Sequence, residues 1–188
     1  GERDEVVRAF RRFIVADQVE VNELSETFAL IHLFGEDAAG WFSSQELTLS
    51  KKIFDVTNCA FGSFFRQRRT KSIGWDLLLE RERLESFVSG LEKAEVSKLD
   101  RAEARKLRFE AGIPSFPEEI NSTSLFSESG IRSAISFRKG CYVGQEVVEK
   151  IDSIGKVPRK ILVADFASKL QLSPGSEILS KDGTKIGI

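Results

Sequence analysis

The chain has 188 residues, of which 41% are apolar and 30% are charged, and its formal net charge is −1. This composition can supply a hydrophobic core for one ordinary domain or two small ones, and it excludes collagen-like, low-complexity and largely disordered proteins. Because the charges nearly balance, no general field attracts nucleic acid or an anionic membrane, and no apolar run approaches the roughly 20 residues that cross a bilayer. We therefore expect neither nucleic acid nor a membrane as a direct partner.

Soft ligands are scarce in the sequence. Two cysteines, Cys59 and Cys141, cannot form the disulfide framework of a small secreted domain, although a single bridge stays open. His32 is the sole histidine, and no Cys-x-x-Cys or His-x-x-x-His spacing occurs. A self-contained zinc or iron-sulfur site needs about four such ligands, so we predict a reducing compartment and no permanently bound metal.

The two ends of the sequence suggest a piece of a longer protein. The chain contains no Met and starts with Gly, so we expect further residues upstream. Near the other end, Asp182 and Gly183 predict a two-residue hairpin turn followed by a strand.

The first third of the chain predicts a helix, a strand and a second helix. Apolar side chains recur at helical spacing over residues 4–14, which predicts an amphipathic helix that has Asp4 as its N-cap and packs on a sheet. Residues 27–34 form a short apolar run and predict a buried strand. Residues 36–47 predict the next helix.

Two further strands and a helix follow. Residues 61–69 and 74–79 predict strands joined by the basic turn 70–73, and residues 80–91 predict a helix. The order strand, helix, strand, strand, helix is most of a ferredoxin-like split β-α-β unit, which is an antiparallel sheet with two helices on one face.

Beyond residue 91 the sequence becomes more polar. Residues 92–110 carry nearly equal numbers of basic and acidic side chains, which predicts a solvated connecting helix. Residues 116–129 are rich in Pro, Ser, Thr and Asn and predict a loop. Residues 161–166 and 177–181 predict the first strands of a separate β unit.

The segment 139–146 reads Lys-Gly-Cys-Tyr-Val-Gly-Gln-Glu and is the most informative in the chain. Glycines on both sides of Cys141 favour a tight turn that presents the thiol. The neighbouring Lys139 favours the thiolate, which is the reactive form, if its charge points toward the sulfur. The residues alone leave two interpretations open, a reactive thiol and a small buried cysteine.

This motif resembles the signature of the YgfZ family, whose members are folate-binding relatives of the glycine cleavage T-protein. A second segment, 107–114, reads Leu-Arg-Phe-Glu-Ala-Gly-Ile-Pro and resembles a segment shared by T-proteins and YgfZ-like proteins. The resemblance is strong from about residue 105 to 160 and weak over residues 1–95.

The resemblance implies an α+β protein with a T-protein-like architecture. Residues 1–95 are then a ferredoxin-like α+β domain. Residues 96–151 are the returning part of a split central folate-binding domain, and residues 152–188 begin a C-terminal β-barrel.

The resemblance also implies roles for five residues. Glu110 falls on the position that binds the pterin of tetrahydrofolate, and a carboxylate can accept two parallel charge-assisted hydrogen bonds from a pterin. Arg108 either pairs with a neighbouring acid or contacts the folate tail. Lys139 supports the thiolate or binds the glutamate tail of folate, and Tyr142 stacks on folate or packs. Cys141 ligates a cluster transiently with a partner's thiols, or acts in redox or thiol transfer.

The function implied is that of a tetrahydrofolate-binding accessory protein for iron-sulfur cluster assembly or repair, including the maturation of tRNA-modifying iron-sulfur enzymes. Its partners would be folate, assembly proteins and client enzymes, in the cytoplasm or alternatively in a mitochondrial or plastid matrix. One alternative is an aminomethyltransferase of the glycine cleavage type, which transfers a one-carbon unit to tetrahydrofolate. Another is an α+β interaction module with an inert thiol.

Other conspicuous side chains are expected to be structural. His32 lies within an apolar run and predicts a core histidine, and Cys59 matches no motif and predicts a core or loop cysteine. The basic group near the second turn predicts an exposed strand-turn surface; its members are Arg66, Arg68, Arg69 and Lys71.

Overall fold

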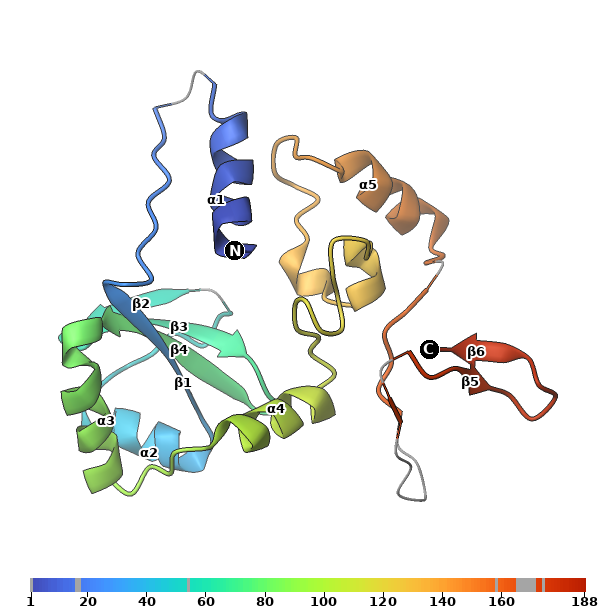
Figure 1. The fold of residues 1–188 in the computed structure, drawn as a ribbon. Coiled ribbons are helices and arrows are strands. Elements are labelled where there is room, and N and C mark those ends of the chain that lie inside the picture. The colour runs from blue at the N-terminus through green and yellow to red at the C-terminus, as the bar shows by residue number, and fades with distance from the viewer. Residues whose placement is uncertain (1, 16–17, 54, 158, 165–171, 174) are drawn as a thin grey trace.

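A four-stranded antiparallel sheet forms the best-packed part of the chain (Figure 1). We analysed a computed structural model that describes residues 2–15, 18–53, 55–157, 159–164, 172–173 and 175–188. The strands are β1 (Phe28–Phe34), β2 (Val56–Cys59), β3 (Gly62–Arg68) and β4 (Ile73–Glu80), and their order in the sheet is β1-β4-β3-β2. The predicted α+β class is confirmed.

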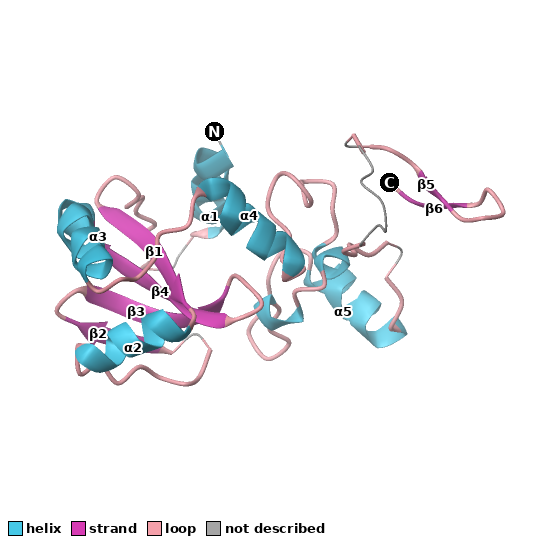
Figure 2. Ribbon diagram, turned by 90° about the horizontal axis from the view of Figure 1, so that it is seen from below, coloured by secondary structure: helices cyan, strands magenta, loops and turns pink. Residues whose placement is uncertain are grey.

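Two helices cover one face of this sheet (Figure 2). They are α2 (Glu36–Ser44), which follows β1, and α3 (Leu84–Lys93), which follows β4 after the short 3-10 turn Arg81–Arg83. The strands β1 and β3 lie on either side of β4, which is antiparallel to both. This is the order expected for a split β-α-β unit. The edge strand β2 was not predicted, because Val-Thr-Asn-Cys carries no apolar run.

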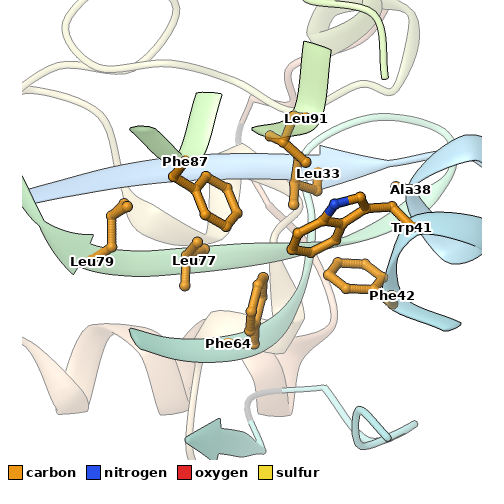
Figure 3. Packing of buried hydrophobic residues seen from close by; sticks show 9 residues of the cluster. All are labelled: Leu33, Ala38, Trp41, Phe42, Phe64, Leu77, Leu79, Phe87 and Leu91. Atoms are coloured by element: carbon orange, nitrogen blue, oxygen red, sulfur yellow. The ribbon is translucent and has the colours of Figure 1, made fainter. Parts of the chain in front are cut away.

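The core lies between these helices and the sheet (Figure 3). Strand alternation points Leu33, Phe64, Leu77 and Leu79 to the same face, where Trp41 and Phe42 of α2 and Phe87 and Leu91 of α3 pack on them. Aromatic rings meet edge to face: the centroids of Trp41 and Phe87 are 5.4 Å apart, and those of Phe42 and Phe64 are 5.2 Å apart. Such pairs add about 0.5–1.5 kcal/mol each beyond their burial.

The first helix, α1 (Glu2–Phe13), does not pack as predicted. Its apolar side chains Val6, Phe10 and Phe13 stay 55–62% exposed, so the expectation that this helix packs on the sheet is wrong. The expected N-cap is wrong too, because the helix begins at Glu2 and contains Asp4. An apolar stripe alone does not specify which surface covers it.

The polar connection after α3 leads to α4 (Arg101–Glu110), an exposed helix that covers the second part of the predicted 92–110, whereas residues 94–100 are not helical. Asp100 begins it with a capping box: the Glu103 N–H donates to Asp100 Oδ1 at 2.8 Å, and the Asp100 N–H donates to Glu103 Oε2 at 3.0 Å. Two orphan donors of the first turn are thereby satisfied. The helix therefore starts at a defined residue.

Turns and two 3-10 helices, Phe126–Ser129 and Arg132–Ala134, then lead to α5 (Gln145–Ile154). The chain ends in a hairpin of β5 (Ile178–Leu179) and β6 (Lys185–Gly187), in agreement with the predicted turn.

The strand predicted at 161–166 is wrong for residues 161–164, which are not in a strand, and residues 165–166 lie outside the described part of the chain. No helix within the described ranges is long and apolar enough to cross a bilayer.

Candidate functional site

The motif around Cys141 forms the entry to α5. Gly144 takes the left-handed conformation (φ 82°), which glycine adopts at little cost, and it directly precedes the helix. The Gln145 side chain folds back, so that its Oε1 accepts a hydrogen bond from the Tyr142 N–H at 3.3 Å. Cys141 is exposed and unpaired directly before this turn, which runs from Tyr142 to Gln145. Its thiol is therefore accessible to a reagent, a metal cluster or a second thiol.

The cation of Lys139 lies on the aromatic ring of Tyr142, the residue after Cys141. The Lys139 Nζ is 4.6 Å from the centroid of the Tyr142 ring, within the range of a cation-π contact. The ring is half-buried, and its hydroxyl is enclosed without a hydrogen-bond partner among the described residues. The structure thus brings the side chains of Lys139 and Tyr142 together, and the folate role of each stays a prediction.

Glu110 is the last residue of α4 and lies between two lysines. Its carboxylate is 3.8 Å from the Lys71 Nζ and 4.0 Å from the Lys106 Nζ, and its side chain is 41% exposed. The carbonyl end of a helix disfavours a carboxylate, so the two cations offset an unfavourable position. Both carboxylate oxygens keep lone pairs for further donors.

Arg108 is engaged within the fold. Its guanidinium donates to both carboxylate oxygens of Glu119 (2.7 and 3.1 Å) and to the Ile113 carbonyl (2.7 Å). The hydrogen bond with Glu119 raises the pKa of Arg108. Burial opposes ionisation of Glu119, but hydrogen bonds from Arg108 and from the Ser115 N–H outweigh it and lower its pKa. Of the two roles predicted for Arg108, the ion pair is the one observed.

The two halves of the predicted site are not in contact. No hydrogen bond, ion pair or ring contact within the described ranges joins Glu110 to the loop that carries Cys141. In Figure 1 the end of α4 and the start of α5 are separated by the turns between them. Their convergence on one folate cleft stays a prediction.

The sequence analysis missed a buried charge cluster on the other face of the sheet. Asp76 is fully buried, and its carboxylate accepts hydrogen bonds from His32 Nδ1 (2.8 Å) and from Nε and Nη2 of Arg69 (both 2.7 Å). Burial opposes ionisation of Asp76, but these partners outweigh it and lower its pKa below the ordinary value of 3.8. The expectation of a core histidine is wrong in its place, because His32 is partly buried on the face opposite the hydrophobic core. Its Nε2 is buried without a hydrogen bond in the described structure.

A signal for this cluster was present in the sequence. His32 and Asp76 lie directly opposite each other on β1 and β4, on the face that Leu33 and Leu77 do not use. An acid inside the apolar run of β4 needs a partner, and strand alternation restricts where that partner can be.

The remaining basic side chains contact the chain itself. Arg66 Nη1 donates to the Lys51 carbonyl, and Arg68 Nε donates to the Thr70 carbonyl at 3.3 Å. Cys59 is half-buried, and its thiol donates to the Gly62 carbonyl at 3.5 Å. Cys59 is the last residue of β2 and packs against the hydrophobic core, so of the two predicted places, core or loop, it has the first. The contacts of Arg66 and Arg68 agree with the predicted strand-turn surface.

A hollow of about 380 Å³ lies between the end of α1 and residues 19–22, and none of the predicted site residues lines it. Among the described residues, no group of three or more His, Cys, Asp or Glu side chains is placed to hold a metal ion.

The fold and the thiol loop define a mixed α+β protein with an antiparallel sheet and an exposed cysteine at a helix entry. No protein-family profile matches the chain. Over 128 residues it is 27% identical to the human mitochondrial iron-sulfur cluster assembly factor IBA57, a match that covers 65% of the chain and 34% of that protein.

Over 82 residues the chain is 30% identical to a chloroplastic protein of Arabidopsis thaliana whose name assigns it provisionally to the transferases, a match that covers 44% of the chain and 18% of that protein. The chain thus spans about a third or less of the curated relatives that it matches.

Proposed function

We propose that this chain is part of a folate-binding accessory factor for iron-sulfur cluster assembly or repair, built on a T-protein-like fold. The observation that carries the proposal is the similarity to a cluster assembly factor along 128 residues. The exposed Cys141 in its glycine-bounded turn supports it. The mitochondrial and chloroplastic names of the two relatives favour an organelle matrix over the cytoplasm.

The proposed domain arrangement follows the sequence resemblance. Residues 1–95 hold the ferredoxin-like domain, for which the strand order β1-β4-β3 is suitable. Residues 96–151 contribute Glu110 and Cys141 to a central folate-binding domain. Residues 152–188 begin a β-barrel, with the β5-β6 hairpin as a first element.

In this proposal Glu110 binds the pterin ring of tetrahydrofolate. Its carboxylate is accessible, and the two lysines contact it at distances longer than a normal hydrogen bond, so both oxygens can still accept N–H donors. Lys71 and Lys106 keep a negative carboxylate compatible with the end of α4. Arg108, held by Glu119, shapes the turn after the helix and leaves the folate tail to other cations, of which Lys139 is one.

Cys141 is the proposed contact to the cluster. One thiolate cannot hold a cluster alone, so the other ligands come from an assembly protein or a client enzyme, including enzymes that modify tRNA. Lys139, which contacts the Tyr142 ring, would in this proposal offer a positive charge to the anionic cluster.

Titration with tetrahydrofolate tests the folate half of the proposal. Glu110→Gln keeps the shape of the side chain and removes its charge, and charge-assisted hydrogen bonds contribute about 1.5–3 kcal/mol, so we expect roughly ten- to a hundredfold weaker binding. Glu92→Gln, on the exposed side of α3, is the control and should bind like the unmodified chain. Equal binding by the Glu110 variant would overturn the assignment.

Thiol chemistry tests the other half. In the folded protein a thiol reagent should label Cys141 much faster than Cys59, because Cys59 is half-buried. In cells that depend on this protein, Cys141→Ser should lower the activity of iron-sulfur enzymes, and Cys59→Ser should not. Full activity with Cys141→Ser would remove the thiol from the mechanism.

The second candidate is an aminomethyltransferase of the glycine cleavage type. The similarity to a protein named provisionally as a transferase favours it. The discriminating assay follows transfer of an aminomethyl group from a lipoyl carrier to tetrahydrofolate. Turnover that survives Cys141→Ser would select the transferase over the accessory factor.

A further inference from the structure

One edge of the main sheet is open. The Arg81 N–H donates to the Thr27 carbonyl at 2.8 Å, which extends the β1-β4 pairing by one hydrogen-bonded pair. Hydrogen bonding alternates along an antiparallel strand, so residues 29, 31 and 33 direct their backbone groups to β4. Leu30 and His32 direct theirs to the other edge, where no described backbone group meets them.

This edge lacks the usual protection against pairing with another strand. The seven residues of β1 read Phe-Ala-Leu-Ile-His-Leu-Phe, with no Lys, Asp, Glu, Pro or Gly, and Leu30 is 51% exposed. Proteins protect edge strands with charges, prolines, short length or a covering segment. The opposite edge, β2, is only four residues long. The unpaired backbone groups and apolar side chains of the β1 edge therefore favour pairing with another strand.

The chain carries a strand-like segment beside this edge. Residues 18–22 read Gln-Val-Glu-Val-Asn, which alternates in the manner of a half-buried strand, and Glu23 and Leu24 lead from it into the turn. The turn from this segment into β1 is already formed, because the Phe28 N–H donates to the Leu24 carbonyl at 2.9 Å. We propose that residues 18–23, here called the strap, close on the free edge of β1 as a fifth antiparallel strand.

The existing bond sets the register of the closed strap. With Leu24 opposite Phe28, Asn22 lies opposite Leu30 and Glu20 opposite His32. Leu30 and His32 are the residues of β1 whose N–H and C=O groups point to the free edge, so this register pairs the strap with the groups that can form hydrogen bonds. A slip by one residue would put every side chain on the wrong face.

The same register places the strap's two valines on the core face. Val21 and Val19 lie opposite Ile31 and Leu33, whereas Gln18, Glu20 and Asn22 lie on the other face. Glu23, next to the turn, lies opposite Ala29 and shares the core face with the valines. In the observed structure Val19 is 56% exposed. Closing breaks the exposed hydrogen bond from Arg11 Nη2 to the Val21 carbonyl and the exposed contact between Arg3 and Glu23. Closing therefore buries the strap's valines and covers the edge of β1. Another chain can pair with this edge only when the strap is open.

Amide exchange measured by NMR on the whole chain tests the proposal. In the closed form the Leu30 and His32 amides exchange at least about tenfold more slowly than in an unstructured peptide, the ratio that corresponds to about 1.4 kcal/mol. The Ile31 amide, bonded to β4 in both forms, reports that the sheet itself is intact. Exchange of Leu30 and His32 at the unstructured rate would overturn the proposal.

Two variants separate the strap from other sources of protection. Val21→Asp places a carboxylate on the core face of the closed strap and should abolish the protection of Leu30 and His32. Asn22→Asp adds the same charge on the outer face and should preserve it. Protection that survives Val21→Asp, or that falls when the protein is diluted as pairing with a second copy requires, would contradict the proposal.

Discussion

Removing the charge of Asp76 is the most informative perturbation of the sheet. Asp76→Asn keeps the size of the side chain but replaces a carboxylate oxygen with an amide group. The carboxylate is fully buried and accepts three hydrogen bonds, from His32 and from two nitrogens of Arg69. The asparagine oxygen can accept some of these, but its amide nitrogen then faces N–H groups that have nothing to donate to.

The loss in the free energy of unfolding depends on whether Arg69 and His32 can find water as a new hydrogen-bond partner. Breaking a fully buried ion pair costs about 3–5 kcal/mol. The Arg69 side chain is 48% exposed and can turn into water, whereas the His32 side chain is only 14% exposed and cannot. We therefore expect a loss of about 2–3 kcal/mol in the free energy of unfolding, below the fully buried range.

Urea denaturation followed by circular dichroism measures this loss. The control is Glu80→Gln, which removes an ion pair with Arg83 in which both side chains are 56% exposed, and it should cost less than about 1 kcal/mol. Arg69→Gln completes a double-mutant cycle with Asp76→Asn, and the two changes should not be additive. If Asp76→Asn costs no more than the Glu80 control, the cluster does not stabilise the sheet.

Three further predictions concern the pH dependence of Asp76, the glycines of β4 and α2, and Arg108. Because the pKa of Asp76 is lower in the folded state than its ordinary value of 3.8, its ionised carboxylate stabilises the fold fully above pH 3.8, and this stabilisation is lost as the pH falls through the pKa of the folded state. The difference in unfolding free energy between Asp76→Asn and the unmodified chain should therefore shrink below about pH 4. Gly74→Ala puts a Cβ 2.3 Å from the Leu33 carbonyl and should cost about 1–3 kcal/mol in urea unfolding, whereas Gly40→Ala, with open space around it, should be neutral or stabilising by up to about 1 kcal/mol. Arg108→Gln leaves the part-buried Glu119 without its cation, and proteolysis should cut residues 111–120 faster than in the unmodified chain.

The sheet and its two helices could be predicted because local patterns decide them. The apolar run of β1 and the alternation in β4 fix which face each side chain takes, and α2 and α3 show helical spacing. The strand β2 could not be predicted, because its Val-Thr-Asn-Cys sequence is held by pairing with β3 rather than by burial.

The partners of the site residues were less accessible to sequence analysis. That Arg108 pairs with Glu119 depends on how the chain turns between them, and no periodicity specifies a turn of this length. The contact between Lys71 and Glu110 joins residues 39 positions apart from separate elements. The exposure of Cys141 is a tertiary property too, although the glycines around it correctly indicated a turn.

At the end of α4 one residue of a short motif holds the fold while another keeps an accessible carboxylate. Arg108 and Glu110 are two positions apart on a helix, so their side chains leave the axis in well-separated directions. Arg108 points to the chain that follows the helix and ties it through Glu119, while Glu110 points to the β3-β4 turn and meets Lys71. The arginine holds the turn after the helix without using the carboxylate two residues later. Glu110 is thereby left as the group of this motif that can still accept a ligand's donors.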